Sequence, residues 1–543
     1  MKAVDAVVEI LKREGVEFLI GYPLNDIIEA AARADMHTII PRQERTGLHM
    51  ADGFSRINAG RPLGVFVMQQ GPGAENSFGG VAQAYGESVP MVVLPAGYPR
   101  RLAQQPPNFS TAANYQRITK WAEQVACADI IGDALRRAFA RARNGRPRPV
   151  VVEIPVDLMQ EEISEPLDYT PAPSARAGPD PRDVEEAARV LVEAPRPLIY
   201  AGQGIHYARA WEGLRQLAEL LAAPVVTSLE GKSAFPENHP LSLGTGGRSM
   251  PRTVPHFLQR ADAILGIGCS FAATSYGVSM PPGKTMVHAT LDAADLHQDL
   301  RADHVLLGDA RLTLEALVQA VADRLGTRQR DSAPLAAEIA AVKTAWMAQW
   351  QAKLNSDEKP LTPYRVIREL MQAVDRANAI ITHDSGSPRD QLSPFWECVA
   401  PLTYIGWGKT TQLGYGLGLA MGAKLAAPDK LCINVWGDAA IGFTGMDFET
   451  AVRERIPILS VLLNNSSMAI ELPVMEVATE KYRSTDISGN YAAMAQAFGG
   501  YGERVEEPGE IAPAIARAIA QTREGTPALL EFITAKELEL SLF

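Results

Sequence analysis

The chain has 543 residues, too many for a single hydrophobic core, so we expect about three domains from a typical length of roughly 150 residues each. Its hydrophobic fraction of 46% and charged fraction of 21% are those of a folded globular protein and exclude an extended disordered chain. The net charge of -11 comes without a basic stripe, which argues against nucleic acid or an anionic membrane as the main partner. We therefore expect a protein that acts on small molecules.

The amino-terminal segment and the cysteines predict the cellular compartment. Residues 1 to 23 interleave charged and apolar side chains at helical spacing, so we expect neither a signal peptide nor a membrane-spanning helix. The cysteines are far apart in sequence and form no CxxC pair, which disfavours a disulfide framework and a zinc site. They are Cys127, Cys269, Cys398 and Cys432. Together these features predict a cytoplasmic protein.

Short β-rich runs alternate with helix-length segments in the first part of the chain. The runs lie at 37 to 41, 63 to 68, 91 to 97 and 150 to 155. This alternation is typical of a parallel sheet covered by helices. A stretch rich in Pro, Ala and charge at 165 to 183 then predicts an inter-domain linker.

The same alternation occurs twice more. In the second block the candidate strands are 197 to 202, 223 to 229, 263 to 268, 285 to 292 and 304 to 309. A polar helical stretch near 334 to 358 leads to a third block, with strands at 379 to 386, 430 to 438, 458 to 465 and 527 to 533. We predict three α/β domains, each a mostly parallel sheet flanked by helices, over residues 1–165, 183–330 and 355–543.

The third block contains a distinctive strand, helix and strand. The first strand ends in Gly437 and Asp438, and the second ends in Asn464 and Asn465. A right-handed crossover points both carboxyl ends to one edge of the sheet, where ligands bind in open α/β sheets. A carboxylate and an amide carbonyl suit a Mg²⁺ ion that a phosphate also binds. The alternative is a turn aspartate and a capping asparagine pair.

Small residues surround this aspartate. Gly437, Ala439 and Ala440 leave room for a diphosphate to approach backbone amides. The spacing of GDA, 24 residues and then NN resembles the cofactor motif of thiamin diphosphate enzymes, which normally reads GDG. Segments 42 to 60 and 69 to 97 resemble the pyrimidine-binding domain of the acetolactate synthase-like group of that family, and 231 to 244 resembles its middle domain. The resemblance covers the chain end to end and implies pyrimidine-binding, middle and diphosphate-binding domains, with thiamin diphosphate and Mg²⁺ as cofactors.

Glu44 is the first residue that the resemblance singles out. It matches the glutamate that hydrogen-bonds the aminopyrimidine ring of the cofactor and promotes its imino tautomer. This role requires a carboxyl group shielded from water. The alternative is a charge at a helix amino terminus. We expect Glu44 at the end of a short strand.

The resemblance also implies a set of cofactor contacts and metal ligands. Asp438, Asn465 and the carbonyl of Ser467 match the Mg²⁺ ligands. Leu413 matches the apolar wedge that bends the cofactor, and Thr411 matches the residue whose backbone carbonyl meets the amino group of the cofactor. The alternative for either residue is an ordinary position in the core or in a turn. The full set of implied cofactor contacts is Ser385, Gly386, Ser387, Thr411, Leu413, Gly437, Asp438, Ala439, Ala440, Asn465 and Met468.

The family places the glutamate and the Mg²⁺ site on different subunits. The resemblance therefore implies a homodimer, and a homotetramer as in many relatives. It also implies a small-molecule substrate that is a 2-keto acid or an acyl-CoA.

Glu471 bears on the type of reaction. It follows Asn465 by six residues, the spacing of a proton-transferring glutamate in pyruvate and indolepyruvate decarboxylases. An acid at this place suits protonation after carbon-carbon cleavage, so we predict a lyase or carboligase that decarboxylates a 2-keto acid. The alternative is a solvent-facing glutamate on a helix.

Several differences between this chain and members of the family narrow the range of activities that we expect. Segment 108 to 121 contains no histidine, whereas the decarboxylases carry a His-His pair there. Acetolactate synthases carry an Arg and a Trp where this chain has Ser270 and Val474, which disfavours acetolactate formation. Segment 268 to 277 lacks the charged FDDR pattern of the flavin-binding relatives, which disfavours flavin.

Two other functions stay open. The chain also resembles 2-hydroxyacyl-CoA lyases and oxalyl-CoA decarboxylases. For an acyl-CoA substrate, Lys232, Arg248 and Arg301 are candidates to meet the nucleotide phosphates, and the alternative for each is a surface charge. The GQG at 202 to 204 lacks the third glycine of GxGxxG and is weak evidence for a nucleotide. The second alternative is a thiamin-fold binding protein without catalysis, for which Ala439 is the one hint.

Overall fold

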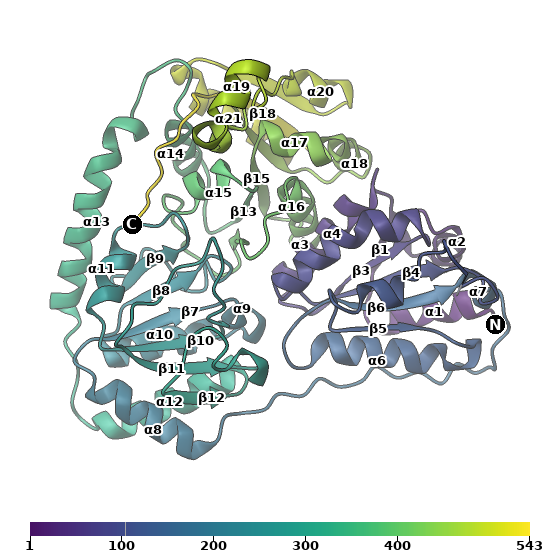
Figure 1. Cartoon of the computed structure of the whole chain (residues 1–543), viewed down its shortest axis with the longest axis horizontal. Coiled ribbons are helices and arrows are strands. Elements are labelled where there is room, and N and C mark those ends of the chain that lie inside the picture. Colours follow the sequence, from purple (N-terminus) through teal and green to yellow (C-terminus); the bar gives the residue numbers. More distant parts are fainter. Residues whose placement is uncertain (104) are drawn as a thin grey trace.

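The computed structural model describes residues 1–103 and 105–543. Within this part of the chain, three six-stranded sheets are each flanked by helices, and every strand pair in them is parallel (Figure 1). In Figure 1 the first sheet lies in the purple and blue part, the second in the teal part and the third in the green and yellow part. The predicted fold class of three parallel α/β domains is confirmed.

The first sheet has the strand order β2-β1-β3-β4-β6-β5. Its strands are β1 (Phe18–Tyr22), β2 (His37–Ile39), β3 (Gly64–Met68), β4 (Met91–Gly97), β5 (Trp121–Gln124) and β6 (Val150–Pro155). Its helices are α1 (Ala3–Arg13), α2 (Asn25–Arg33), α3 (Glu44–Ile57), α4 (Pro72–Gly86), α5 (Thr111–Tyr115), η1 (Ala128–Ile130), α6 (Ile131–Arg143) and α7 (Val156–Met159).

The second sheet has the order β9-β8-β7-β10-β11-β12, which is that of doubly wound dinucleotide-binding sheets. Its strands are β7 (Pro197–Ala201), β8 (Val225–Ser228), β9 (Ser242–Gly246), β10 (Ala263–Ile267), β11 (Thr285–Thr290) and β12 (His304–Leu307). Its helices are α8 (Pro181–Glu193), α9 (Gly204–Ala208), α10 (Trp211–Leu221), α11 (Thr253–Arg260), η2 (Ala293–Asp295) and α12 (Ala310–Leu325).

The third sheet has the order β14-β13-β15-β16-β18-β17. Its strands are β13 (Ala379–His383), β14 (Tyr404–Ile405), β15 (Leu431–Gly437), β16 (Leu459–Asn464), β17 (Tyr501–Val505) and β18 (Ala528–Ile533). Its helices are α13 (Ala333–Leu354), α14 (Pro363–Ala373), α15 (Ser387–Leu392), α16 (Tyr415–Ala426), α17 (Asp438–Thr444), η3 (Gly445–Asp447), α18 (Phe448–Arg453), η4 (Ala469–Val474), α19 (Glu476–Tyr482), α20 (Tyr491–Ala497), η5 (Pro508–Glu510) and α21 (Ile511–Arg523).

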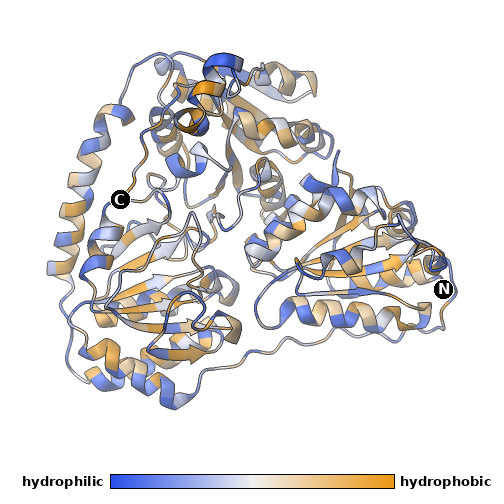
Figure 2. Ribbon diagram, in the orientation of Figure 1, coloured by the Kyte–Doolittle hydropathy of each residue, from blue (hydrophilic) through white to orange (hydrophobic). Residues whose placement is uncertain are grey.

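The burial of these elements follows their sequence patterns. All six residues of β6 are buried, as expected for a strand covered by helices on both faces. Helix α1 instead buries one apolar side and ends in the exposed residues Lys12 and Arg13. Figure 2 makes the same contrast visible, with largely orange strands inside and helices of mixed colour outside.

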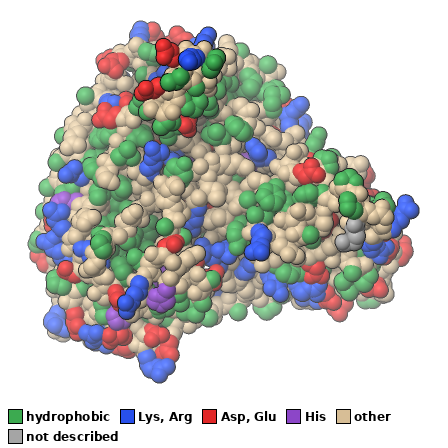
Figure 3. All heavy atoms as spheres, viewed as in Figure 1, with side chains coloured by type: hydrophobic (Ala, Val, Ile, Leu, Met, Phe, Trp, Pro, Cys, Tyr) green, Lys and Arg blue, Asp and Glu red, His purple; other side chains and the backbone are tan. Residues whose placement is uncertain are grey.

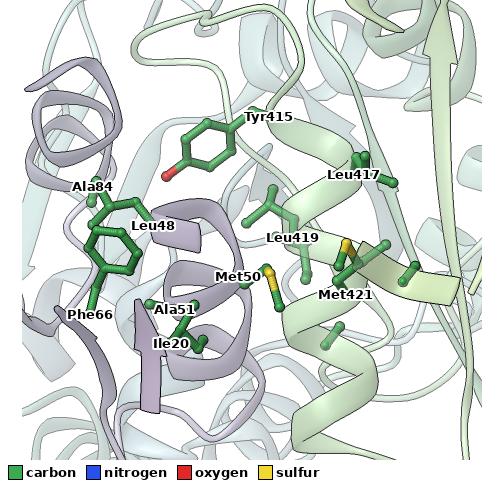
Figure 4. Close-up of a cluster of buried hydrophobic side chains, with 14 of the residues drawn as sticks. Ile20, Leu48, Met50, Ala51, Phe66, Ala84, Tyr415, Leu417, Leu419 and Met421 are labelled. Atoms are coloured by element: carbon green, nitrogen blue, oxygen red, sulfur yellow. The ribbon is translucent and has the colours of Figure 1, made fainter. Parts of the chain in front are cut away.

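The first and third domains share one hydrophobic core where α3 packs on α16 (Figure 4). Leu48, Met50 and Ala51 of α3 lie near Leu417 and Leu419 of α16 within this core. The contact is close because glycines on both helices face the other backbone. A Cβ at Gly53 would collide with the carbonyl of Leu419, and one at Gly422 with the carbonyl of Met50.

The structure adds five short strands to those predicted. They are β1, β5, β9, β14 and β17. Most of them are short or at a sheet edge, and β17 reads YGERV, so charge and glycine hide the β pattern. The linker that we predicted at 165 to 183 contains no regular element until α8 begins at Pro181. The exact domain boundaries stay predictions.

Charges of both signs are interspersed over the face in Figure 3. Among the residues that the structure describes, we find no helix that combines the length and the apolar character needed to cross a membrane.

Candidate active site

A cavity of about 280 Å³ opens at the carboxyl edge of the third sheet. Strands β15 and β16 pair side by side, as the crossover predicts, so the residues that follow them meet at this edge. Thirteen of the residues predicted from the sequence line the cavity. These are Ser385, Gly386, Ser387, Thr411, Leu413, Gly437, Asp438, Ala439, Ala440, Asn465, Ser467, Met468 and Glu471.

Asp438 is the first residue of α17 and is almost fully buried. Its Oδ1 accepts the amide of Ala439 at 3.0 Å, and its Oδ2 accepts the amide of Ser467 at 3.0 Å. Burial raises the pKa of this carboxyl to about 6, and the backbone amides only partly offset that effect. A buried carboxylate without a cationic side chain against it is a suitable ligand for a metal ion.

The two asparagines after β16 have different environments. Asn464 turns inward, where its Nδ2 donates to Glu531 at 2.7 Å. Asn465 lines the cavity, and its Oδ1 accepts the amide of Ser467 at 3.0 Å, the same amide that Asp438 accepts. Ser466 has a φ of 55°, in the left-handed region, and this turn separates the two side chains.

The residues of this cavity fit a magnesium ion shared with a diphosphate. The hydroxyl of Ser467 is buried without a partner among the described residues. The described residues contain no cluster of three His, Cys, Asp or Glu side chains, so a metal here needs oxygen atoms from its ligand as well. Gly386 has a φ of 82°, and a Cβ there would meet no atom within 4 Å, which leaves an open space beside the backbone for a phosphate.

Asp384 joins two of the loops that line the cavity. Its carboxylate accepts the amides of Ser385 at 2.8 Å, of Gly414 at 2.9 Å and of Gly416 at 2.9 Å. These bonds tie the loop after β13 to the start of α16, beside Leu413. Burial raises the pKa of Asp384 to about 6, while the amides oppose the rise.

The segment before α16 is also held by the first domain. Oε1 of Glu87 accepts the amides of Gly408 at 3.0 Å, of Lys409 at 2.7 Å and of Thr410 at 3.3 Å. The side chain of Gln83 accepts the amide of Gln412 at 3.0 Å. Since Gln83 lies in α4 and Glu87 directly follows it, the end of this helix positions the chain that leads to Thr411 and Leu413.

Glu44 does not lie at this cavity. It is the first residue of α3, five residues after Ile39 at the end of β2, so our expectation of a strand end was wrong by one short loop. Its carboxylate is buried and accepts the side-chain amide of Asn76 at 3.2 Å. Burial raises the pKa of Glu44, as a carboxyl shielded from water requires.

Glu471 lies in η4 and is half-buried. It lines the cavity together with Asp438 and Asn465. Its role in proton transfer stays a prediction, as does the alternative of a solvent-facing glutamate. Its backbone amide bonds to the carbonyl of Met468 at 3.0 Å, which fixes the short helix next to Asn465.

A second cavity, of about 410 Å³, lies at the edge of the middle sheet and against the first domain. Gln203 and Gly204 of the GQG turn line it, as do Ser270 and Phe271. The ring of Phe271 stacks on Tyr200 with centroids 5.7 Å apart and fills part of this edge.

Lys232 is not available to meet nucleotide phosphates. Its ammonium group is buried and bonds to Glu237 at 2.5 Å and to the hydroxyl of Thr245 at 3.3 Å. The burial of Lys232 contradicts both the prediction that it meets nucleotide phosphates and the alternative that it is a surface charge. Arg301 is exposed, and Arg248 lies 3.7 Å from Asp390.

The sequence alone did not single out Asp384, Glu87 or Arg389. Asp384 directly follows β13 in HDSG, so an acid at a strand end was the available signal. Glu87 gave no local signal, because the amides that it accepts lie in the third domain. Arg389 gave none either, because its packing on Tyr276 joins two domains.

The chain belongs to the thiamine pyrophosphate enzyme family, because three family models match it in order. The N-terminal TPP binding domain matches residues 1–123, the central domain residues 184–317 and the C-terminal TPP binding domain residues 384–532.

Curated relatives match over nearly the whole chain. A probable acetolactate synthase large subunit of Methanocaldococcus jannaschii is 28% identical, over 98% of this chain and 92% of the relative. A probable acetolactate synthase large subunit of Methanococcus aeolicus is 28% identical, over 100% of this chain and 93% of the relative. The acetolactate synthase isozyme 3 large subunit of Escherichia coli is 27% identical, over 96% and 93%. The chain is thus related to acetolactate synthases at modest identity.

Proposed function

We propose that this protein is a thiamin diphosphate- and Mg²⁺-dependent lyase or carboligase that decarboxylates a 2-keto acid. The observation that carries the proposal is the convergence of Asp438, Asn465 and the loop 385–387 on one cavity, with Glu471 on its wall. The domain matches support the cofactor class. The cofactor supplies an electron sink for the bond that breaks next to the carbonyl group.

The third domain holds the cofactor in this proposal. Asp438, Asn465 and the carbonyl of Ser467 would bind the metal ion, and the amides around Gly386 and Ala440 would face the diphosphate. Leu413 and Thr411 would orient the rings. The bonds from Asp384 and Glu87 to neighbouring amides keep these two residues in place before the cofactor arrives.

Two carboxyl groups handle protons. Glu44, whose raised pKa reflects its burial, would bind the aminopyrimidine nitrogen and keep solvent from competing for the shared proton. Glu471, half-buried on the cavity wall, would donate a proton to the carbon left after loss of carbon dioxide. The product would then be an aldehyde.

A complete site requires a second copy of the chain in this proposal. Glu44 is absent from the residues that line the cavity around Asp438, yet one cofactor must meet both. Large apolar side chains are exposed on the elements that carry the two halves, as expected for surfaces that a partner covers. They are Phe78 on α4, Phe443 on α17, Met446 in η3, Val474 in η4, and Val477 and Tyr482 on α19.

A hybrid dimer tests this arrangement. We expect Glu44→Gln and Asp438→Ala chains to be inactive alone and to regain activity when co-expressed and purified by two different tags. In the hybrid, one site combines the intact Glu44 of one chain with the intact Asp438 of the other. A hybrid without activity would place both residues in one chain's site and contradict the proposal.

Mass spectrometry of product mixtures tests the reaction. The protein loaded with thiamin diphosphate and Mg²⁺ is incubated with a panel of 2-keto acids and 2-hydroxyacyl-CoA thioesters. We expect carbon dioxide and an aldehyde or carboligation product from a keto acid. Formyl-CoA from the thioesters alone would contradict the proposal and favour the lyase, and acetolactate from pyruvate would favour the activity of the named relatives.

A further inference from the structure

Arg389 is a buried arginine that the mechanism above does not use. It lies on α15, two residues after Ser387, and lines the same cavity as Asp438. Its side chain is 2% exposed. A guanidinium group cannot lose its charge at ordinary pH, so a full positive charge is present at the wall of this cavity.

The contacts of Arg389 leave one end of its guanidinium group without a partner. Nε donates to Oδ1 of Asp390 at 2.8 Å, and Nη2 donates to Oδ2 of the same carboxylate at 3.0 Å. The ring of Tyr276 covers the face, with its centroid 3.9 Å from Cζ. Nη1 is buried without a hydrogen-bond partner among the described residues. The edge and the face are therefore occupied, and Nη1 is a buried donor whose hydrogen bonds no described residue accepts.

The local charges do not balance. Arg248 of the middle domain places its Nη1 3.7 Å from Oδ2 of Asp390, so two guanidinium groups share a single carboxylate. Tyr276, which also lines the cavity, comes from the middle domain as well. An unpaired donor on a buried charge is costly, and an anion in the cavity would satisfy both the donor and the charge.

We propose that Arg389, fixed by Asp390 and Tyr276, binds a second acidic group of the substrate, so that the preferred substrate is a 2-keto acid with a further carboxylate or similar anion. This inference rests on the proposed function. The carboxylate that leaves as carbon dioxide is not a good partner for the guanidinium. It loses its charge during the reaction, and a fixed cation would stabilise the ground state more than the transition state.

The diphosphate of the cofactor is the other anion that Arg389 can meet, because Ser387 lies on the same helix. Two matched keto acids distinguish binding of a substrate carboxylate from binding of the cofactor diphosphate. They are 2-oxoglutarate and 2-oxopentanoate, which have the same chain length and differ by the terminal carboxylate. For Arg389→Met we expect the KM for 2-oxoglutarate to rise by about tenfold to a hundredfold. The KM for 2-oxopentanoate and the Kd for thiamin diphosphate, measured by calorimetry, should change less than about threefold.

Variants control for folding and for bulk charge. Arg389→Lys keeps the charge without the bidentate fork and should show an intermediate KM for the diacid. Arg260→Met removes an exposed arginine of the middle domain and should leave both KM values unchanged. If Arg389→Met does not fold, the inference is tested with Arg389→Lys instead, by the ratio of its KM for 2-oxoglutarate to its KM for 2-oxopentanoate.

The outcomes separate the inference from the proposed function. A weaker Kd for the cofactor with equal changes for both keto acids would assign Arg389 to the diphosphate and overturn the inference. A lower melting temperature alone would assign it to a structural role with the buried hydroxyl of Tyr404, which also lacks a partner among the described residues. If no keto acid is converted, the proposed function fails, but glutarate should still bind the wild-type protein and not Arg389→Met. A wild-type protein that binds neither diacid overturns the inference.

Discussion

The first and third domains are built on the same plan, yet they carry different chemistry. When the strands of each are numbered in chain order, both sheets have the order 2-1-3-4-6-5. Helices α3 and α16 follow equivalent strands and pack on each other in one core (Figure 4). One helix begins with Glu44, whereas the segment before the other contains Thr411 and Leu413.

The difference lies in the loops at the carboxyl edge of each sheet. In the third domain, β15 and β16 are followed by Asp438 and Asn465, which fit a metal ion. In the first domain, the equivalent strands β3 and β4 are followed by uncharged residues, and the buried acid is Glu44 instead. Under the proposed function, one scaffold would supply two half-sites, and short loops would determine which half each domain becomes.

The largest effect is expected from Glu44, the acid of the first half-site. Glu44→Gln keeps the shape and the hydrogen bond to Asn76 but cannot share a proton with a ring nitrogen. We expect turnover to fall by about a hundredfold or more, with unchanged folding by circular dichroism. Turnover equal to that of the wild-type protein would remove Glu44 from the mechanism.

Asp438 of the second half-site should affect metal binding instead. We expect Asp438→Ala to weaken Mg²⁺-dependent binding of thiamin diphosphate by at least about tenfold, measured by titration with Mg²⁺. Asn464→Ala is the matched control, because Asn464 bonds to Glu531 rather than facing the cavity. The control should lower the melting temperature and leave the Mg²⁺ dependence as it was; the opposite pattern would exchange the roles of the two residues.

Glu471 sharpens the comparison by separating two steps of the reaction. We expect Glu471→Gln to slow aldehyde release by about tenfold or more, while the release of carbon dioxide in a single turnover changes less. Rapid quenching and isotope-labelled substrate measure the two rates. Equal slowing of both would return Glu471 to a structural role on the cavity wall.

The raised pKa of Asp438 predicts a pH effect on the protein without cofactor. Because the folded-state value of about 6 exceeds the ordinary value of 3.8, the folded protein holds this proton more tightly. The contribution of this group to stability therefore falls as pH rises from about 4 to about 6. We expect Asp438→Asn to stabilise the cofactor-free protein by about 2 kcal/mol at pH 7 and by much less at pH 4. Equal stabilisation at both pH values would contradict this pKa.

The smallest effect is expected from Glu87, through which the first domain positions the second half-site. Glu87→Ala removes the acceptor of three backbone amides before Thr411, so we expect cofactor affinity to fall by about three- to tenfold. Gln83→Ala removes one such bond and should have a smaller effect. Calorimetry gives both affinities. A Gln83 variant as weak as the Glu87 variant would contradict this order.

Much of this picture was predictable from the sequence, and the reasons are physical. The strands of the three sheets are buried on both faces and therefore read as apolar runs, such as β6 and β16. Asp438 and Asn465 were predictable because a parallel crossover brings two strand ends together. Edge strand β17 was not predictable, because its charged residues interrupt the apolar pattern that marks a strand.

Other parts of the site depend on contacts between distant elements. Glu87 binds amides more than 300 positions away, and Arg389 stacks on a tyrosine of the middle domain. Lys232 looked like a surface charge because its partner Glu237 gives no signal that both are buried. The contacts of Glu87 and Arg389 form only when the domains pack together. The pair of Lys232 and Glu237 lies within the middle domain and becomes visible only when that domain is folded.

Calorimetric titration of the cofactor-free protein with thiamin diphosphate, with and without Mg²⁺, tests the central claim most directly. We expect one cofactor per chain in the presence of Mg²⁺, much weaker binding in its absence, and binding by Asp438→Ala that is weaker by at least about tenfold. Binding that ignores both Mg²⁺ and Asp438, or no binding by the wild-type protein, would contradict the assignment of this cavity.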